Sequence, residues 1–438
     1  MKRLLVIFVA VILFSERSTA QNDTLFLNVN EAVSLSLREN RNIQISHLEI
    51  DMASSGVREA RGRLLPRVEA SGSYNYNILR PVIFLPPGSP FGEVLQLGAD
   101  HSFSGTLSGS VPIYSGGIYP GIRLAETNVQ LARESDRETR INTVAEVKRN
   151  YYNTLLALES VRVMEVTHQN ALQNFRQVRQ QFDQGVVSEY ELVRAEVQLQ
   201  SVLPSLEQSI DNYQVNMEML KLSIGLAPGT AMVLTDSLRL ERADVELEVS
   251  VEDNPSLRRL RYQNVLAEQQ VSLAQSAKHP TLSAFANYQM QTQAEHLDIT
   301  TYDWVNTSIT GLQLNIPIFN GLMTNQQIEQ ARIGKKQIEQ QRKMTDDAIK
   351  TQVQNQLFLM RQAWNRYQAQ QNSVQLAERG LRIARTRYTG GIGTLLELND
   401  AELALTQARL NYLQAIYDYN IAHAEYERLT GRANIDIN

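Results

Sequence analysis

The hydrophobic pattern of the chain changes its period along the sequence. Between about residues 122 and 182 apolar side chains recur every seven residues, and the stretch from about 353 to 388 repeats this pattern. Such a stripe is typical of helices that pack knobs-into-holes in a coiled coil, although the core of an ordinary helical bundle looks similar. A helix of ~60 residues is about 90 Å long. The pattern therefore predicts helical rods with apolar sides, which need lateral neighbours.

Each long stripe ends at a short break and is followed by a second, shorter helical stripe. Gly185 interrupts the first heptad pattern and Gly391 interrupts the second. Ser188 and Thr394 follow these glycines, and both residue types favour helix N-caps. The sequence therefore predicts two helical hairpins, over about 120–224 with a tip at 185 and over about 322–430 with a tip at 391.

Between the helical stretches the pattern alternates with a period of two. Val68 and Ala70, for example, alternate with Glu69 and Ser71. Long strands with one apolar and one small polar face suit a lipid-facing barrel with a wet interior, and a soluble sandwich is the alternative. Four strands cannot close a barrel, and hydrocarbon does not tolerate unpaired edges, so we expect three copies to supply twelve strands. The predicted strands are about 66–80, 101–114, 280–294 and 303–318, with Pro66, Pro112, Pro280 and Pro317 expected at strand ends.

The chain is an internal duplication. Phe182–Glu196 aligns with Tyr388–Glu402, and Val111–Gly116 aligns with Ile316–Gly321, with prolines and glycines in the same order. Chance similarity between helices would not reproduce these positions. The predicted organisation is a signal peptide over 1–20, a first repeat over 21–229 that opens with a helix near 31–62, an equatorial segment over 230–251, and a second repeat over 252–438 that opens with a helix near 252–278.

The first twenty residues have the pattern of an export signal. Lys2 and Arg3 precede an apolar run from Leu4 to Phe14, and a polar stretch ends at Ala20. An N-terminal anchor that stays in place is the alternative. Later segments hold no uninterrupted apolar run of roughly 18 residues, so no transmembrane helix is expected. We expect an exported mature chain that begins at Gln21.

Composition narrows the functional classes. Lys and Arg number 42 against 47 Asp and Glu, for a net charge of −5 and a pI near 5.8, which argues against nucleic acid as a partner. The absence of cysteine excludes disulfides, thiolate metal sites, cysteine nucleophiles and lipidation of an N-terminal cysteine. The six histidines are scattered without metal-ligand spacing. We therefore expect no catalytic residues, no metal, no cofactor and no enzymatic activity.

The duplicated breaks and the two corners Val111–Gly116 and Ile316–Gly321 resemble those of the TolC-type outer membrane efflux proteins. The resemblance covers nearly the whole mature chain. It implies an α+β membrane protein, a homotrimer whose twelve-stranded transmembrane β-barrel continues into a long periplasmic α-helical coiled-coil barrel. The implied function is a passive exit duct in the cell outer membrane, as part of a tripartite efflux or secretion system. Because the chain has no cysteine to acylate, no lipid anchor is expected. The implied partners are a periplasmic adaptor (membrane fusion) protein, an inner-membrane pump of the RND, ABC or a similar class, and outer membrane lipid.

The resemblance also implies roles for residues at the two tips. Glu397 and Asp400, three residues apart and hence on one helix face, match acidic residues that form the periplasmic gate, and a solvated outer face is the alternative. Glu191 and Tyr388 match residues that tie tips together, although the family's usual residue at the first position is aspartate. Gly393 stands where some members carry an arginine of this clasp. Adaptor docking is implied for Gly185, Val186, Val187, Ser188, Gly391, Ile392 and Thr394, with bare turns as the alternative.

Two other classes of function remain at this stage. Long heptads alone are compatible with an exported structural or adhesive trimeric coiled coil without transport activity, but the alternating strands and duplicated tips argue against it. A periplasmic enzyme on a helical scaffold has no catalytic motif to support it. The loop from Pro81 to Asp100, which is rich in apolar residues and proline, is expected at the outer surface.

Overall fold

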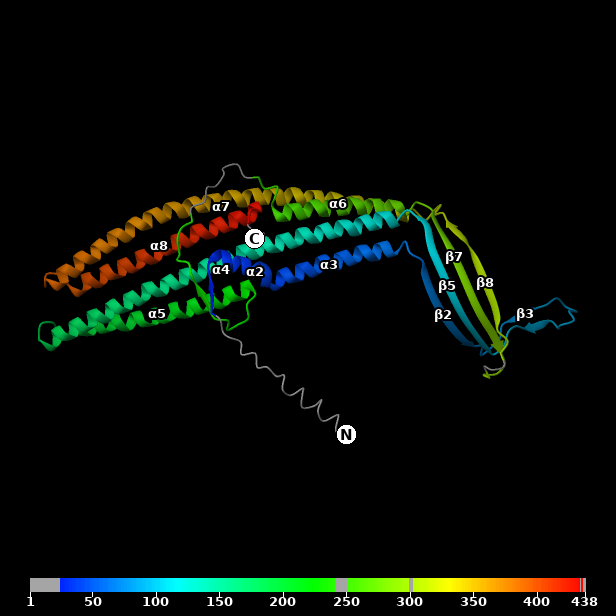
Figure 1. The fold of residues 1–438 in the computed structure, drawn as a ribbon, viewed down its shortest axis with the longest axis horizontal. Helices are drawn as coiled ribbons and strands as arrows, with labels where there is room; N and C mark the ends of the chain where they lie inside the picture. The colour runs from blue at the N-terminus through cyan, green and yellow to red at the C-terminus, as the bar shows by residue number, and fades with distance from the viewer. Residues whose placement is uncertain (1–23, 242–249, 299–301, 434, 436–438) are drawn as a thin grey trace, which may run out of the picture. The chain divides into compact units, whose positions relative to one another are not determined.

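The computed structural model describes residues 24–241, 250–298, 302–433 and 435 of the 438-residue chain (Figure 1). These residues form two compact units. The predicted signal peptide over 1–20 lies outside the described residues, as do residues 242–249 of the predicted equatorial segment. The first unit, which we call the helical unit, comprises the described residues within 1–45, 137–255 and 347–438. The second, which we call the sheet unit, comprises those within 46–136 and 256–346.

The helical unit contains long helices and a two-stranded parallel sheet. Its elements are β1 (Leu25–Leu27), α2 (Val29–Glu39), α5 (Glu189–Ile224), β6 (Met232–Leu234), α8 (Leu395–Thr430) and the parts of α4 (Ile118–Asp183) and α7 (Met323–Thr389) from residues 137 and 347 onward. Strands β1 and β6 pair in parallel, with Leu25 opposite Met232 and Leu27 opposite Leu234. Four helical segments of this length provide the apolar stripes that the heptad pattern predicts.

The main core of the helical unit surrounds Tyr151 of α4, whose side chain is fully buried. Its hydroxyl lies 3.0 Å from the backbone oxygen of Leu27 and 2.9 Å from the Asp236 carboxylate, two acceptors that share its one proton. The same carboxylate accepts a bond from the backbone N–H of Val29, at the start of α2, at 2.8 Å. Burial and the bond to Asp236 raise the pKa of Tyr151, so the phenol stays neutral and keeps β1, α2 and α4 together.

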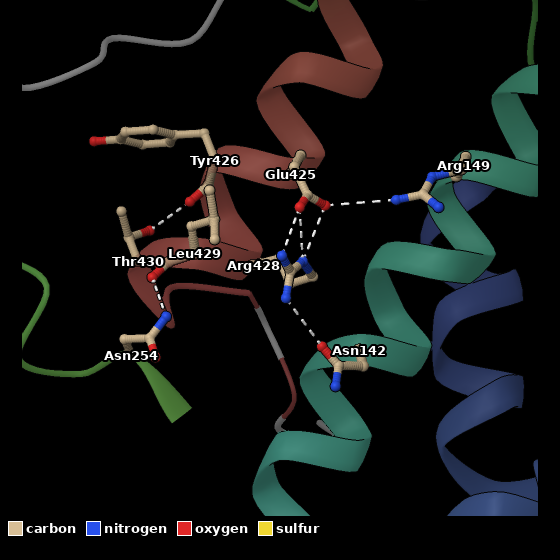
Figure 2. Close-up of polar contacts among 8 residues, drawn as sticks. All are labelled: Asn142, Arg149, Asn254, Glu425, Tyr426, Arg428, Leu429 and Thr430. Atoms are coloured by element: carbon tan, nitrogen blue, oxygen red, sulfur yellow. Dashed lines mark hydrogen bonds and ion pairs between the residues drawn. The ribbon is translucent and has the colours of Figure 1, made fainter. Parts of the chain in front are cut away.

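The C-terminal end of α8 is held by polar contacts with two other segments (Figure 2). Arg428 donates to Glu425 one turn earlier, with a shortest distance of 2.6 Å, and to the side-chain oxygen of Asn142 at 3.4 Å. Arg149 lies 3.5 Å from the same Glu425 carboxylate. The Asn254 amide donates to the backbone oxygen of Leu429 at 2.7 Å, which satisfies a carbonyl that a helix end leaves without an intrahelical partner.

The helix predicted near 31–62 is broken at Asn40. Helix α2 ends at Glu39 and α3 (Arg41–Gly62) begins one residue later, because the backbone of Asn40 is extended. The buried Asn40 amide donates to the backbone oxygen of Ser223 at 2.7 Å, and its oxygen accepts from the N–H of Asn42 at 2.8 Å. Asparagine often bonds to nearby backbone in this way, so the side chain competes with helix continuation.

The sheet unit is built on an antiparallel sheet with the strand order β2-β5-β7-β8. The four strands are β2 (Arg67–Tyr76), β5 (His101–Ser115), β7 (Thr281–Ala294) and β8 (Val305–Asn315). A separate hairpin, β3 (Val82–Phe84) and β4 (Val94–Gln96), lies in the loop between β2 and β5. The unit also contains most of α3, helix α6 (Pro255–Ser276), and the parts of α4 and α7 up to residues 136 and 346.

The register places like side chains on the same face of this sheet. Ala70 lies opposite Leu107, which lies opposite Tyr288, and Tyr74 lies opposite Phe103 with ring centroids 4.8 Å apart. The other face is mostly polar, with serines and a threonine along β5 and glutamines along β7, although Phe285 also lies on it. The sheet is therefore amphipathic, apolar on one face and mostly polar on the other.

Two details of the sheet concern Pro112 and strand β8. Pro112 does not end its strand: β5 continues to Ser115, and a register shift between Pro112 and Tyr114 accommodates the ring that lacks a donor. Strand β8 is less regular, since its register puts Ser308 on the apolar face and Ile309 on the polar face.

Within the described ranges no helix combines the length and the apolar character needed to cross a membrane. The described residues also contain no cluster of three or more histidine, aspartate or glutamate side chains placed to hold a metal ion.

Candidate functional site

The two predicted tips are tight turns between antiparallel helices of the helical unit. Helix α4 ends at Asp183, and Gly185 follows with φ of 72°, in the left-handed region that favours glycine. The N–H of Gly185 donates to the backbone oxygen of Phe182 at 2.8 Å, and that of Val186 donates to Gln181 at 2.9 Å. This is the pattern of bonds by which a glycine closes a helix C-terminus.

The second tip repeats this geometry after α7. Gly391 has φ of 73° and donates to the backbone oxygen of Tyr388 at 3.0 Å. The N–H groups of Ile392 and Gly393 both donate to the backbone oxygen of Arg387 at 3.0 Å. The close match between the two turns follows from the duplicated sequence.

The two tips differ in their N-caps. The Thr394 side chain accepts a hydrogen bond from the N–H of Glu397 at 3.2 Å and caps α8. Ser188 is in the N-cap position of α5 with the same extended backbone, but its side chain makes no capping bond. The expectation that both residues cap the following helix with their side chains is therefore wrong for Ser188, and the start of α5 relies on backbone geometry.

The tips share one hydrophobic cluster, which we call the tip core. Side chains from all four helical segments meet in it, with Leu398 2% and Leu395 3% exposed on α8. The buried members are Val178, Leu192, Ala195, Leu381, Leu395, Leu398 and Leu405. Because both hairpins contribute to one core, a movement of one tip has to repack the other.

The residues predicted to dock a partner divide into exposed and packed groups. Val186 is 69% exposed and Ile392 is 74% exposed, each next to its turn glycine. Val187 instead packs against the tip core. Apolar side chains this exposed at the same place in both turns are more typical of a contact surface than of a solvated turn.

The two predicted gate residues lie on the face of α8 opposite to the tip core. Glu397 and Asp400 are exposed or half-exposed, whereas Leu395 and Leu398 nearby point inward. The structure also places Arg387 beside Glu397, with Nε 3.6 Å from the carboxylate and both side chains about half exposed. Sequence reasoning missed Arg387. Its position just before the tight turn, across from the first turn of α8, is the signal that identifies it.

The predicted tip-linking pair lies between the two hairpins of one chain. The Tyr388 hydroxyl is 3.4 Å from the side-chain oxygen of Gln181 on α4, and its ring packs against the tip core. Burial, and to a smaller extent the nearby Glu191 carboxylate, raise the pKa of Tyr388. One carboxylate oxygen of Glu191 is buried and has no hydrogen-bond partner among the described residues.

A further polar group just beyond the gate residues was also missed by sequence reasoning. Glu402 of α8 is 9% exposed; its carboxylate accepts from the Asn174 amide at 3.0 Å and from Arg385 at 3.4 Å. Burial raises the pKa of Glu402, and the bonds from Asn174 and Arg385 oppose this effect. Thr406, one turn later, contacts Thr167 through a hydroxyl pair at 3.0 Å. These contacts fix the register of α8 against α4.

A shallow groove of about 530 Å³ lies farther along the same helices. Leu359, Tyr417 and Ile421 form part of its wall. The two arginines in its lining are paired with acidic groups, since Arg366 lies 2.6 Å from Asp418 and Arg149 lies 3.5 Å from Glu425. The groove is amphipathic, as expected for the side of a helical hairpin that packs laterally.

The chain combines long antiparallel helical hairpins, which have apolar tips, with an amphipathic antiparallel sheet. It is therefore an α+β protein in which helical and sheet segments alternate along a duplicated sequence. The profile of the family described as outer membrane efflux protein matches residues 32–226 and 247–432. The chain belongs to this family.

Individual relatives agree with this assignment. The chain is 23% identical over 451 residues to outer membrane protein TolC of Escherichia coli strain K12, with 99% of this chain and 87% of TolC covered. It is 23% identical over 402 residues to the cation efflux system protein CusC of Escherichia coli O157:H7, with 90% and 83% covered. The family resemblance predicted from the sequence is confirmed, and nothing supports the alternative of an adhesive coiled coil.

Solved structures show that the fold is TolC-like. The Campylobacter jejuni CmeC outer membrane channel superposes with a TM-score of 0.77 at 19% identity, over 92% of this chain and 85% of that one. The open state of the MtrE outer membrane channel of Neisseria gonorrhoeae gives a TM-score of 0.72 at 17% identity, over 94% and 91%.

Proposed function

We propose that this protein is the passive outer membrane exit duct of an efflux or secretion system. In this proposal three copies form a twelve-stranded barrel in the outer membrane, continuous with an α-helical tunnel in the periplasm. Substrates enter the tunnel from a periplasmic adaptor and an inner-membrane pump. The two structural repeats, 21–229 and 252–438, would contribute equivalent hairpins to the tunnel wall, and the mature chain would begin after a cleaved signal peptide.

The observation that carries the proposal is the amphipathic four-stranded sheet with two open edges. Among the described residues β2 pairs only with β5, and β8 pairs only with β7. Its apolar face suits lipid and its mostly polar face suits a wet lumen. Because a sheet in hydrocarbon must have no unpaired edge, the β2 edge of one copy would pair with the β8 edge of another until the barrel closes.

The exposed acids support a gate at the periplasmic end of such a duct. Glu397 and Asp400 point away from the tip core, so threefold repetition would give two rings of carboxylates. Such rings attract cations and repel one another. Arg387 beside Glu397 offsets part of this charge. Glu191 and Tyr388 would hold the tips together in the closed state.

Docking of the adaptor is proposed for the exposed part of the two turns. Val186 and Ile392 offer apolar contacts, and Gly185, Ser188, Gly391 and Thr394 offer backbone and small side chains. Val187, which packs inward, would support the turn rather than contact the partner. The name of the relative CusC, a cation efflux system protein, is consistent with a role inside a larger assembly.

Two measurements on the purified protein test this proposal together. Light scattering in detergent should give the mass of three chains, and liposomes that contain the protein should become permeable to small solutes. A monomer in detergent, or inserted protein that leaves liposomes sealed, would contradict it.

A further inference from the structure

The hairpin formed by β3 and β4 exposes more apolar surface than a solvated loop usually does. In the sheet unit it lies beyond the ends of β2, β5, β7 and β8 that are remote from α3 and α6 (Figure 1). Phe84 is 76% exposed and Phe91 is 72% exposed. The other exposed apolar side chains of the hairpin and its arms are Val82, Ile83, Val94, Leu95 and Leu97.

Both faces of this hairpin are apolar. The pairing places Phe84 opposite Val94 on one face and Ile83 opposite Leu95 on the other, because cross-strand partners share a face and successive residues alternate. Glu93 is the one charged residue between Pro81 and Ala99. A hairpin that packs on one flat surface needs only one apolar face. This hairpin has two, so we expect a neighbour to cover each of them.

The base of the hairpin is fixed to the sheet. Arg80 donates to Asp100 at 2.8 Å and also pairs with Glu295, just past the end of β7. The Asn77 N–H and its side-chain amide donate to the backbone oxygens of Asp100 and Ala99, both at 2.8 Å. These contacts give the hairpin a set direction away from the sheet, so its apolar faces are displayed and not folded back.

We propose that the hairpins of three copies pack against one another around the outer end of the duct, so that a second copy of this chain is the partner of each face. A threefold ring places every hairpin between two identical neighbours, which is the arrangement that covers both faces at once. The hairpin follows directly from β2, whose open edge is where another copy would join, so this contact continues the subunit interface. The inference rests on the proposed trimeric duct.

Cysteine cross-linking tests the contact directly, because the natural chain contains no cysteine. In the double variant Phe84→Cys/Leu95→Cys the two thiols lie on opposite faces of one hairpin, so they cannot readily join within a chain. In a ring, one face of each copy meets the other face of the next. Mild oxidation of the full-length trimer should therefore produce covalent trimers that reductant separates. Val82→Cys/Leu95→Cys repeats the test if the first variant does not assemble when reduced.

The controls separate the possible outcomes. Leu297→Cys, 62% exposed between β7 and β8, reports disulfides formed by collision between trimers. If both double variants form trimers but cross-link no more than Leu297→Cys does, the hairpin contact is overturned and the proposed duct still stands. A wild-type protein that is not a trimer would overturn the proposed duct itself. If brominated lipids quench a fluorophore attached to Phe84→Cys, lipid and not a second copy covers the hairpin, and the proposed contact is wrong.

Discussion

Gly431 and Gly391 both follow the end of a long helix with a left-handed backbone, but their surroundings differ. A methyl group on Gly431 would lie 2.1 Å from the backbone oxygen of Asp253, whereas nothing lies within 4 Å of the same position at Gly391. Gly391 is thus required for its φ angle alone, and Gly431 for its φ angle and for a close backbone contact.

Alanine substitution should separate these two requirements. Gly391→Ala should destabilise the protein by about 1 kcal/mol, the cost of a left-handed alanine. Gly431→Ala should cost about 2 kcal/mol more, because the backbone at Asp253 has to move. Thermal unfolding of both variants in the same detergent measures the difference, and equal midpoints would show that the close contact is not maintained.

Glu402 gives a pH-dependent prediction at the same scale. Burial raises its pKa above the usual 4.5, so the folded protein binds this proton more readily than the unfolded chain does. The stabilising effect of protonation is therefore fully present below pH 4.5, the usual pKa of the group, and is lost as the pH rises through the raised pKa of Glu402. Glu402→Gln, whose amide oxygen still accepts from Asn174, should be more stable than the wild type near neutral pH. This advantage should shrink in acid.

The matched control for this substitution is Glu196→Gln, at the equivalent and exposed position of the first hairpin. Thermal unfolding as a function of pH should show the effect for Glu402→Gln alone. If both variants respond alike, burial of Glu402 has no effect on stability and the prediction fails. If Glu402→Gln is less stable than the wild type at neutral pH, the carboxylate stabilises the hairpin contact as an ion and the predicted sign is wrong.

At the scale of elements, the two helical hairpins begin their second helices in different ways. Thr394→Ala removes a side-chain cap and should lower the stability of the first turn of α8 by about 1 kcal/mol. Ser188→Ala removes no capping bond and should cost less than about 0.5 kcal/mol. Hydrogen exchange of the amides at 395–398 and 189–192 measures each effect locally. Faster exchange after the serine substitution would reveal a cap at Ser188.

Sequence periodicity predicts the long helices and strands well because their burial patterns repeat many times. Helices α4, α5, α7 and α8 present their stripes over several heptads, and strands β2, β5 and β7 are ten or more residues long. The break at Asn40 was not predictable in this way, since it depends on a partner distant in sequence, the backbone oxygen of Ser223. The register shift beside Pro112 likewise depends on the paired strand β7.

The candidate site was predictable in position but not in detail. The turn glycines and Glu397 with Asp400 stand out in the sequence, and their functional roles stay predictions. Glu402 and Arg387 matter through three-dimensional neighbours: Asn174 lies 228 residues away from Glu402 along the chain. No local pattern distinguishes the buried Glu402 from the exposed Glu196, which occupies the same place in the repeat.

For the molecule as a whole, the proposed function depends on assembly. The open edges of the sheet, the exposed tips and the two-sided apolar hairpin are surfaces that a single chain leaves uncovered. Copies of the chain around a common channel would close the sheet, cover the hairpin and arrange the acidic residues in rings, and the proposed adaptor would cover the tips. The family and the TolC-like fold agree with this arrangement.

Single-channel conductance of the purified protein in a planar lipid bilayer is the sharpest test of the proposed duct. We predict discrete conductance steps, partial block by divalent cations at the acidic rings, and weaker block with higher conductance in Glu397→Gln/Asp400→Asn. Asp211→Asn, which changes one exposed carboxylate of α5 outside the tips, is the matched control and should behave like the wild type. An inserted protein that shows no conductance steps would contradict the duct, and steps unchanged in the double variant would remove Glu397 and Asp400 from the gate.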